Sequence, residues 1–520
     1  MKIIVPMAGT GKRFDDYLSP KPLIDIEGKP MIEHALSFLP KDNDFIFLCN
    51  ENHLKTTNME AILRELVPNL KIIPVPSHTK GPAYTSLLAF EDIKDEEEVI
   101  VTYCDTIQIF DFEEFMKKIR EIKLSGALLS FKGFHPASLG ETYYCYLKVN
   151  EQGFIEELKE KESYTNNRLE EFASSGVYYF ASGKIFKDYV KQLTSNEQNA
   201  VNGEFYMSLP FNIMIKDGLK VLNYPINKFI SLGIPRDYEM YKFWSEFFLN
   251  YSRKGITFDN ININVTNIFP LAGGEKDFKE LGFEGLNFMI PVMNKPLIEY
   301  ALKSNPKGVK NIFIGLQENE HLFKNYSLFN TLNSRVILLE KKKESLIKTL
   351  LTIKKEIGAD AAICISGATH ILNYNEKNMI NLMEKNDIDI ILFSFSHDEA
   401  ILRNPLGFAY AKLKNNIEIE EIKEKETISD NPYADNALTG TAIFKKAADL
   451  FEAIELELLK PNPSKYYLSS LNNILNKKKT VIFKVDKFVP VRTITNYKEF
   501  TYWEDYFDSL KYHPYKKEYN

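Results

Sequence analysis

Cysteine and histidine are scarce in this chain, and their scarcity limits the sites that it can build. Its 520 residues include four cysteines, without the paired spacing of a disulfide framework or a metal-binding motif. Three of the four end or lie within apolar runs, so we expect buried, reduced thiols in a cytoplasmic protein. The eight histidines are scattered and form no cluster with the cysteines, which argues against a zinc site.

The sequence also lacks a strong charge of either sign and any long hydrophobic run. The formal net charge of −6 disfavours nucleic acid or an anionic membrane surface as a partner. No segment approaches about 18 uninterrupted apolar residues, so we expect no membrane span. The first residues run directly into a glycine turn, too soon for a secretory signal peptide. What is present is an ordinary globular composition, 44% hydrophobic and 26% charged.

The most informative feature of the chain is an internal repeat. Residues 4–14, IVPMAGTGKRF, reappear as 268–278, IFPLAGGEKDF, and 28–36, GKPMIEHAL, reappear as 294–302, NKPLIEYAL. Further matches follow in the same order: 160–162 with 424–426, 175–177 with 439–441, 204–208 with 465–469, and 229–238 with 488–497. A period of about 260 residues indicates a domain duplication, because solenoid repeats are far shorter.

The repeat predicts two domains, residues 1–252 and 267–520. The polar, Asn-rich stretch 253–266 between them is interpreted as a linker, but its alternating apolar residues also fit a short bridging strand. Within each copy, short β-branched or aromatic runs alternate with amphipathic segments such as 31–38, 59–66, 84–90 and 112–122. This alternation predicts an α/β fold with a mostly parallel sheet and helices on both faces. Ligands of such sheets bind at the carboxyl ends of the strands.

Three segments of the first copy carry candidate chemistry at such strand ends. The turn 7–13, MAGTGKR, follows the first strand, and its glycines allow backbone N–H groups to face a phosphate that Arg13 could hold bidentately. Lys21 lies between two prolines, which present it on a stiff extended strip. Asp105 ends an apolar strand, a suitable place for a Mg²⁺ ligand. Taken singly, each also has an ordinary explanation: a plain turn, a surface lysine, and a helix or turn cap.

Taken together, these segments resemble the sugar-1-phosphate nucleotidyltransferase family. The resemblance spans residues 1–245 and includes PMAGTGKRF, PKPL, GKPMI and YCD, then EK at 160, SGVYYF at 175 and GIPRD at 233. It implies tandem Rossmann-like (GT-A-like) α/β/α domains, use of Mg²⁺, and transfer of a nucleotidyl group from an NTP to a phosphorylated small-molecule acceptor, with release of pyrophosphate.

The resemblance also implies roles for individual residues. Arg13, Lys21 and Asp105 would be the catalytic residues, with Arg13 and Lys21 neutralising the triphosphate and Asp105 binding Mg²⁺. The remaining roles are nucleotide binding by Ala8, Gly9, Gly11 and Gly81, and acceptor binding by Glu160, Lys161 and Gly176. Several family members have a second metal-binding aspartate where this chain has Ser231, and Asp237 is the nearby candidate to replace it.

The second copy has lost the residues to which this chemistry is assigned. The counterparts of Gly11, Arg13 and Lys21 are Glu275, Asp277 and Asn287, and Asp105 falls near Thr369. Carboxylates in place of an arginine would repel a triphosphate. We therefore expect a degenerate second domain that keeps the fold and buttresses the first.

The leading hypothesis is a nucleotidyltransferase that makes a nucleotide sugar, with surface polysaccharide synthesis as the use that the family suggests. One alternative is a cytidylyltransferase acting on phosphocholine or a polyol phosphate. A choline pocket would need an aromatic cage, for which Tyr143, Tyr144, Tyr178 and Tyr179 are candidates near the acceptor wall at 140–144. A second alternative, from another class, is an inactive regulatory nucleotide-binding protein. The sequence does not specify the base, the acceptor or the oligomeric state.

Overall fold

The computed structural model describes residues 1–140, 143–254, 263–273, 276–511 and 513–515. The chain forms two compact units, Met1–Lys242 and Phe243–Asn520. This division falls inside helix α8 (Pro235–Lys254), whereas the sequence predicted the first domain to extend to residue 252. Part of the stretch predicted as a linker or strand, residues 255–262, lies outside the described residues, and strand β14 (Ile263–Pro270) begins directly after it.

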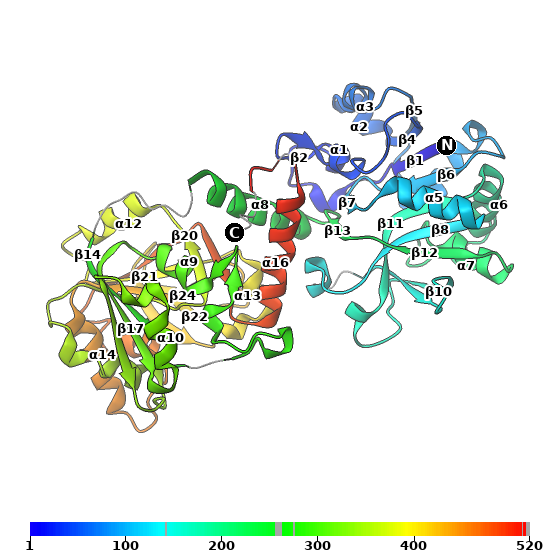
Figure 1. The fold of residues 1–520 in the computed structure, drawn as a ribbon. Helices are drawn as coiled ribbons and strands as arrows, with labels where there is room; N and C mark the ends of the chain where they lie inside the picture. The colour runs from blue at the N-terminus through cyan, green and yellow to red at the C-terminus, as the bar shows by residue number, and fades with distance from the viewer. Residues whose placement is uncertain (141–142, 255–262, 274–275, 512, 516–520) are drawn as a thin grey trace. The chain divides into compact units, whose positions relative to one another are not determined.

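The first unit is built on a mixed sheet of nine strands within the described residues (Figure 1). Its main path runs in the order β10-β9-β11-β6-β1-β4-β5, with β8 pairing β11 and β12. The bounds are β1 (Lys2–Met7), β4 (Asp44–Asn50), β5 (Leu70–Val75), β6 (Val99–Thr102), β8 (Gly126–Phe131), β9 (Cys145–Val149), β10 (Ile155–Glu160), β11 (Phe172–Phe180) and β12 (Val221–Pro225). Strands β7 (Thr106–Ile109) and β13 (Lys228–Ser231) form a separate pair.

Half of this sheet is parallel, as expected, and half is not. Strand β1 runs parallel to β4 and β6, and β4 runs parallel to β5. Strand β11 runs antiparallel to β6, β8 and β9. The alternation of short strands and helices therefore predicted the α/β class, but it did not show that the chain reverses direction at β11.

Helices cover both faces of this sheet, because the strands bury side chains on both faces. Val5 packs in a core with residues of α1 (Met31–Ala35), α3 (Met59–Leu66) and α5 (Phe112–Ile122), whereas its neighbour Ile4 packs in a core with residues of α4 (Pro82–Ser86), α6 (Gly183–Thr194) and α7 (Leu209–Lys216). Successive strand residues point to opposite faces, so an unbroken apolar strand requires cover on both. This confirms the predicted α/β/α layering.

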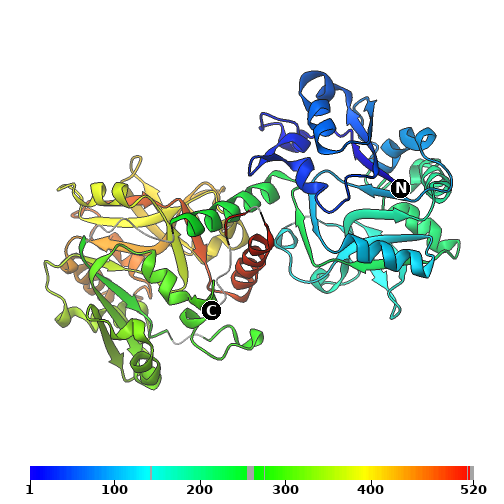
Figure 2. The ribbon, with the colours of Figure 1, turned by 45° about the horizontal axis from the view of Figure 1, so that its top comes forward.

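The second unit repeats this topology with its own nine-stranded sheet, counted over the described residues, in the order β18-β17-β14-β19-β24-β21-β25 (green through yellow to orange in Figure 2). The other bounds are β17 (Gly308–Leu316), β18 (Ser334–Leu339), β19 (Ile363–Ile365), β21 (Ile390–Phe395), β22 (Ala409–Leu413), β23 (Ile419–Glu424), β24 (Asn436–Phe444) and β25 (Thr480–Lys484), with β20 (His370–Asn373) and β26 (Lys487–Pro490) as the separate pair. Its helices are α9 (Leu297–Lys303), α10 (Glu320–Asn325), α11 (Leu346–Leu351), α12 (Glu376–Met383), α13 (Glu399–Arg403), α14 (Ala447–Leu458), α15 (Tyr467–Ser470) and α16 (Ile494–Ser509).

Two expectations about composition can be compared with the structure. All four cysteines are buried and unpaired, as predicted. Among the helices of the described residues, none is both long and apolar enough to cross a membrane.

Candidate active site

The glycine turn lies at the carboxyl end of β1, where the sequence places it. Ala8 is buried, and its carbonyl oxygen accepts a hydrogen bond from Asn50 Nδ2 at 3.1 Å. Gly11 has φ +69°, a left-handed conformation that favours glycine, and it begins the short helix Lys12–Phe14. Nothing lies within 4 Å of a Cβ added at Gly9, so the turn has open space beside its backbone.

Lys21 and Asp105 form an ion pair, so neither is an isolated surface group. Their side chains are 19% and 20% exposed, and Lys21 Nζ also donates to the carbonyl oxygen of Gly233 at 3.0 Å. A Cβ added at Gly11 would lie 3.9 Å from the Cβ of Lys21, which puts the glycine turn beside this pair. Residues from the turn, the proline strip and the end of β6 thus meet in one place.

The second carboxylate, Asp237, lies just behind this cluster. It is 2% exposed and accepts a hydrogen bond of 2.6 Å from Ser231 Oγ. A Cβ added at Gly233 would lie 3.4 Å from Asp105 Oδ2 and 3.7 Å from Ser231 Oγ. No group of three or more histidine, cysteine or carboxylate side chains suited to a metal occurs in the described parts of the chain. The oxygens that converge here are one carboxylate and one hydroxyl, backed by a second carboxylate.

Glu160 and Lys161, the predicted acceptor residues, lie together at the end of β10. The Glu160 side chain is 5% exposed and accepts a hydrogen bond of 2.5 Å from Ser208 Oγ. Burial raises the pKa of Glu160, and the Ser208 hydroxyl and the Lys161 charge oppose the rise. Lys161 has φ +61°, and its Nζ lies 5.2 Å from the centre of the Tyr206 ring.

Arg13 is exposed and belongs to the same neighbourhood. Burial raises the pKa of the Tyr206 hydroxyl, and the Arg13 guanidinium opposes that rise. Tyr206 therefore lies near both Arg13, predicted for the triphosphate, and Lys161, predicted for the acceptor. The two predicted halves of the site are adjacent in the structure.

Gly81 and Gly176 occupy positions where a side chain does not fit. Gly81 has φ +90°, and an added Cβ would lie 2.7 Å from the backbone oxygen of Phe205. Gly176 has φ +89°, and its Cβ would lie 2.8 Å from the ring of Tyr103. Both contacts are shorter than van der Waals distance, so these glycines are required by the local backbone as well as predicted for binding.

The four tyrosines considered for a choline cage do not converge. Tyr178 and Tyr179 are both buried, but they are consecutive in β11 and belong to opposite cores. Tyr143 is 42% exposed and packs against Arg168, whose guanidinium carbon lies 4.7 Å from the ring centre. Residues 141–142 of the predicted acceptor wall lie outside the described residues.

Sequence reasoning missed several contributors to this cluster. Ser208 donates to Glu160, Tyr206 packs under Lys161, and Asn50 holds the glycine turn. None belongs to a recognised motif. The repeat gave a signal for Ser208 and Tyr206, because the segment 204–208 has a counterpart in the second copy.

In the second unit, an asparagine and a threonine replace the lysine–aspartate pair of the first. The backbone N–H of Val491 donates to the carbonyl oxygen of Thr369, as that of Leu232 donates to Asp105, each at 2.8 Å, so Thr369 does stand at the position of Asp105. Asn287 Nδ2 donates to Asp277 Oδ2 at 2.9 Å, which pairs the counterparts of Lys21 and Arg13 with each other. The remaining counterpart, Glu275, lies outside the described residues.

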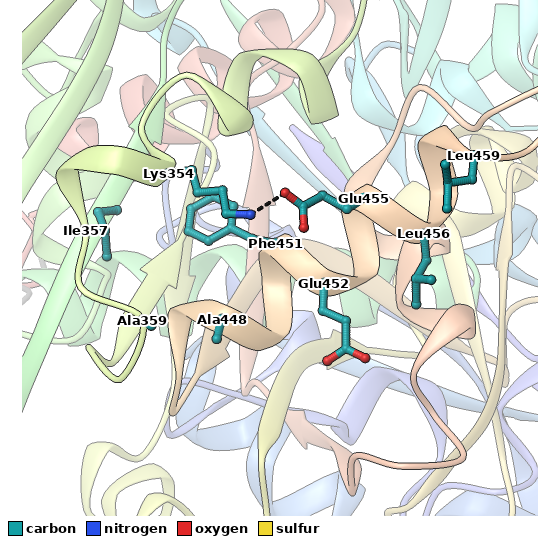
Figure 3. Close-up of a pocket in the computed structure, with 9 residues that line it drawn as sticks. All are labelled: Lys354, Ile357, Ala359, Ala448, Phe451, Glu452, Glu455, Leu456 and Leu459. Carbon is teal, nitrogen blue, oxygen red and sulfur yellow. Dashed lines mark hydrogen bonds and ion pairs between the residues drawn. The ribbon is translucent and has the colours of Figure 1, made fainter.

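A cavity of about 370 Å³ in the second unit is separate from these residues (Figure 3). It lies along α14, where Phe451 and Leu456 line it beside an ion pair between Lys354 and Glu455. None of the residues predicted for the site lines it.

Comparison with solved structures finds proteins that resemble part of the chain. A nucleoside-diphosphate-sugar pyrophosphorylase from Vibrio cholerae RC9 is 21% identical, with 46% of this chain and 98% of that chain covered and a TM-score of 0.37. The inositol-1-phosphate CTP transferase from T. maritima is 10% identical, with 47% and 98% covered and a TM-score of 0.38. A search of curated proteins finds no significant match.

The family assignment rests on a sequence match rather than on these structural similarities. The family model described as nucleotidyl transferase matches residues 2–208 and again residues 271–506. The match covers most of the chain and falls once on each copy of the repeat. The chain therefore belongs to the nucleotidyl transferase family, in which it carries the domain twice.

Proposed function

We propose that the first unit transfers a nucleotidyl group from an NTP to a sugar 1-phosphate. A phosphate oxygen of the acceptor attacks the α-phosphorus of the NTP, and the bond from that phosphorus to the bridging oxygen breaks, so that pyrophosphate leaves with the bonding electrons. The observation that carries this proposal is the Lys21–Asp105 ion pair beside the glycine turn. It supplies a cation for phosphates and a carboxylate for a metal at one strand edge.

The proposed roles of the residues follow from charge and position. Arg13 and Lys21 neutralise the triphosphate and the leaving pyrophosphate, and Ala8, Gly9, Gly11 and Gly81 line the nucleotide. Glu160, Lys161 and Gly176 face the acceptor. No side chain needs to form a covalent intermediate, so catalysis consists of holding the two phosphates in line and neutralising charge that develops during transfer.

Mg²⁺ is part of this proposal, and the oxygens at the site are of the kind that Mg²⁺ binds. Magnesium prefers hard oxygen ligands and is often held by one or two carboxylates together with substrate phosphates. Asp105 would hold it, with Ser231 and Asp237 as the neighbouring oxygens. The ion would supply positive charge to the phosphates. With substrate bound, Lys21 would have phosphate oxygens as partners in place of Asp105.

The same residues distinguish between the alternative functions. A phosphocholine acceptor is not favoured, since the candidate tyrosines do not form a cage. A polyol phosphate would use the same Glu160 and Lys161 and stays an alternative acceptor. An inactive regulatory protein is disfavoured by the intact Lys21–Asp105 pair. Cytoplasmic location and use of the product in surface polysaccharide remain predictions.

The test is a screen of pyrophosphate release by the full chain. Five nucleoside triphosphates are combined with sugar 1-phosphates, polyol phosphates and phosphocholine, each with and without Mg²⁺. We expect release for one base with a sugar 1-phosphate, and only with Mg²⁺. Release with a polyol phosphate alone would select the alternative acceptor. No release with any pair, from protein that binds NTP, would favour the regulatory alternative.

A further inference from the structure

The second unit keeps the acceptor side of the domain although it has lost the triphosphate side. At the end of β23, Glu424 and Lys425 repeat Glu160 and Lys161, and Lys425 has φ +57°. Its Nζ lies 5.1 Å from the ring centre of Tyr466, as Lys161 lies over Tyr206. Gly440 repeats Gly176, with φ +87°. If this surface of the second unit had only a structural role, it would not need to retain an exposed lysine over an aromatic ring.

The structure corrects the alignment of the two copies near this side. Asn212 exchanges hydrogen bonds with the backbone of Leu158, and Asn472 does the same with Ile422. With these two asparagines aligned, residues 204–208 match residues 464–468 rather than 465–469. Ser208 then corresponds to Leu468, not to Ser469. The hydroxyl that donates to Glu160 is therefore replaced by an apolar side chain in the second unit.

Glu424 consequently has one unsatisfied carboxyl oxygen. Its Oε2 is buried and has no hydrogen-bond partner among the described residues. Burial raises the pKa of Glu424 to about 7, and the Lys425 charge opposes the rise. Buried polar atoms without partners are rare because each is costly, so a ligand that donates a hydrogen bond to this carboxyl group would be stabilised.

Open space lies beside Gly440, where the first unit has the ring of Tyr103. A Cβ added at Gly440 would meet nothing within 4 Å, whereas one at Gly176 would meet Tyr103. Ile365 pairs with Ala442 as Val101 pairs with Tyr178, so Gly367 and Ala442 replace Tyr103 and Tyr178. The second unit is thus more open at Gly440 than the first unit is at Gly176.

Two cations lie near Phe408. The backbone N–H of Lys425 donates to the Phe408 carbonyl oxygen at 3.0 Å, and the Arg492 guanidinium carbon lies 5.7 Å from the Phe408 ring centre. Arg492 follows Val491, so it stands where the first unit has Gly233, beside the metal-binding position. The Tyr466 hydroxyl raises the pKa of Lys425, and the Arg492 charge opposes the rise.

We propose that the second unit binds a hydroxylated phosphomonoester, a sugar or polyol phosphate, without nucleotide or metal. Lys425 and Arg492 neutralise its phosphate. Glu424 accepts a hydrogen bond from a hydroxyl group, and the space at Gly440 holds the carbon chain. This site is independent of the proposed reaction of the first unit, since none of its residues belongs to that unit.

The experiment is a calorimetric titration of the full chain carrying Lys161→Ala, which weakens the acceptor site of the first unit. The probes are glucose 1-phosphate, sorbitol 6-phosphate, glucose and inorganic phosphate, in the absence of nucleotide and divalent metal. We expect one site per chain for at least one of the two phosphomonoesters, with inorganic phosphate and glucose binding at least tenfold more weakly. Adding Lys425→Ala or Arg492→Ala should each weaken this binding roughly tenfold or more.

The matched control is Lys423→Ala, which removes a partly exposed lysine from the same strand, paired with Glu426 at 2.5 Å. It should leave the affinity unchanged. Lys425 and Arg492 are also exposed, so melting temperatures of all variants should agree, and Glu424→Gln tests the hydroxyl contact separately. The proposal is overturned if neither phosphomonoester binds at about 10 mM, if Lys425→Ala binds as well as Lys423→Ala, or if inorganic phosphate binds as tightly as the esters.

Discussion

At the scale of single residues, the pairing of Lys21 with Asp105 has two consequences. The pair is only about one-fifth exposed, so each charge relies on the other rather than on water. The same two groups are the cation and the carboxylate that the proposed reaction needs at one strand edge. A substrate therefore competes with an existing contact instead of meeting two solvated side chains.

Replacing Lys21 with Met should consequently affect both stability and substrate affinity. The neutral side chain leaves the Asp105 carboxylate without its cation, so the melting temperature should fall. The triphosphate loses one neutralising charge, so its affinity should fall roughly tenfold or more. Thermal unfolding and NTP titration measure the two effects. Lys29→Met is the control, since Lys29 is more exposed and pairs with Glu33 away from the glycine turn, and a Lys21 variant that behaves like it would contradict the assignment.

The raised pKa of Glu424 leads to a separate prediction, which concerns how the stability of the fold depends on pH. Its pKa in the folded chain is raised to about 7 from the ordinary 4.5, so the folded state holds the proton more tightly than the unfolded state. Its contribution to stability is therefore full below about pH 4.5 and is lost as the pH rises through about 7.

The variant Glu424→Gln has no proton to lose at this position. The melting temperature of the variant, relative to that of the wild type, should therefore rise as the pH is raised from about 5 to about 8. Thermal unfolding of both proteins in the same two buffers measures this. A difference between them that stays constant with pH would show that Glu424 titrates normally.

At the scale of elements, the turn into α4 depends on a glycine. Gly81 precedes the helix with φ +90°, and a Cβ there would press on the Phe205 backbone. Gly81→Ala should therefore cost roughly 1–3 kcal/mol and lower the melting temperature by several degrees. Gly9→Ala is the matched control, because its Cβ would meet nothing within 4 Å. Equal melting temperatures for the two variants would show that the turn adapts to a side chain.

The elements also show how far sequence patterns reach. Segments 59–66 and 112–122 were predicted as helices and coincide with α3 and α5, because their apolar residues repeat at helical spacing and Asp111 caps α5. The segment 84–90 is instead divided between α4 and a 3₁₀ helix at Leu87–Asp92, a difference in winding that a short amphipathic pattern does not resolve.

Contacts between distant segments could not be predicted from the sequence. The apolar strands and the glycine turn indicated which edge of the sheet carries the site, but the Ser208–Glu160 bond joins residues 48 positions apart and leaves no local pattern. The one-residue error in aligning the copies has a similar cause. Two consecutive tyrosines, Tyr466 and Tyr467, satisfy either register by sequence, and only the backbone contacts of Asn472 distinguish them.

At the scale of the whole molecule, duplication has kept the fold and changed the charge. Both units have the same strand order, so the apolar pattern that builds the sheet was retained. The first unit has a paired lysine and aspartate where the second has Asn287 bonded to Asp277 and a threonine at position 369. A chain of two similar domains should therefore have one nucleotide site.

Nucleotide stoichiometry tests this expectation. Titration of the full chain with a non-hydrolysable NTP analogue should give one site per chain in the presence of Mg²⁺ and a much weaker interaction in excess chelator. The reason is that Arg13, Lys21 and Asp105 are replaced in the second unit by Asp277, Asn287 and Thr369. Two sites per chain, or equal affinity with and without the metal, would contradict the division of roles.

The most direct test of the central claim compares equivalent substitutions in the two units. Pyrophosphate release is measured for the full chain with Asp105→Ala and with Thr369→Ala, its counterpart in the second unit. The account predicts that Asp105→Ala lowers turnover on the order of 10²–10³-fold with an unchanged fold, while Thr369→Ala leaves turnover at the wild-type level. Wild-type turnover in Asp105→Ala, or an equal loss in both variants, would contradict it.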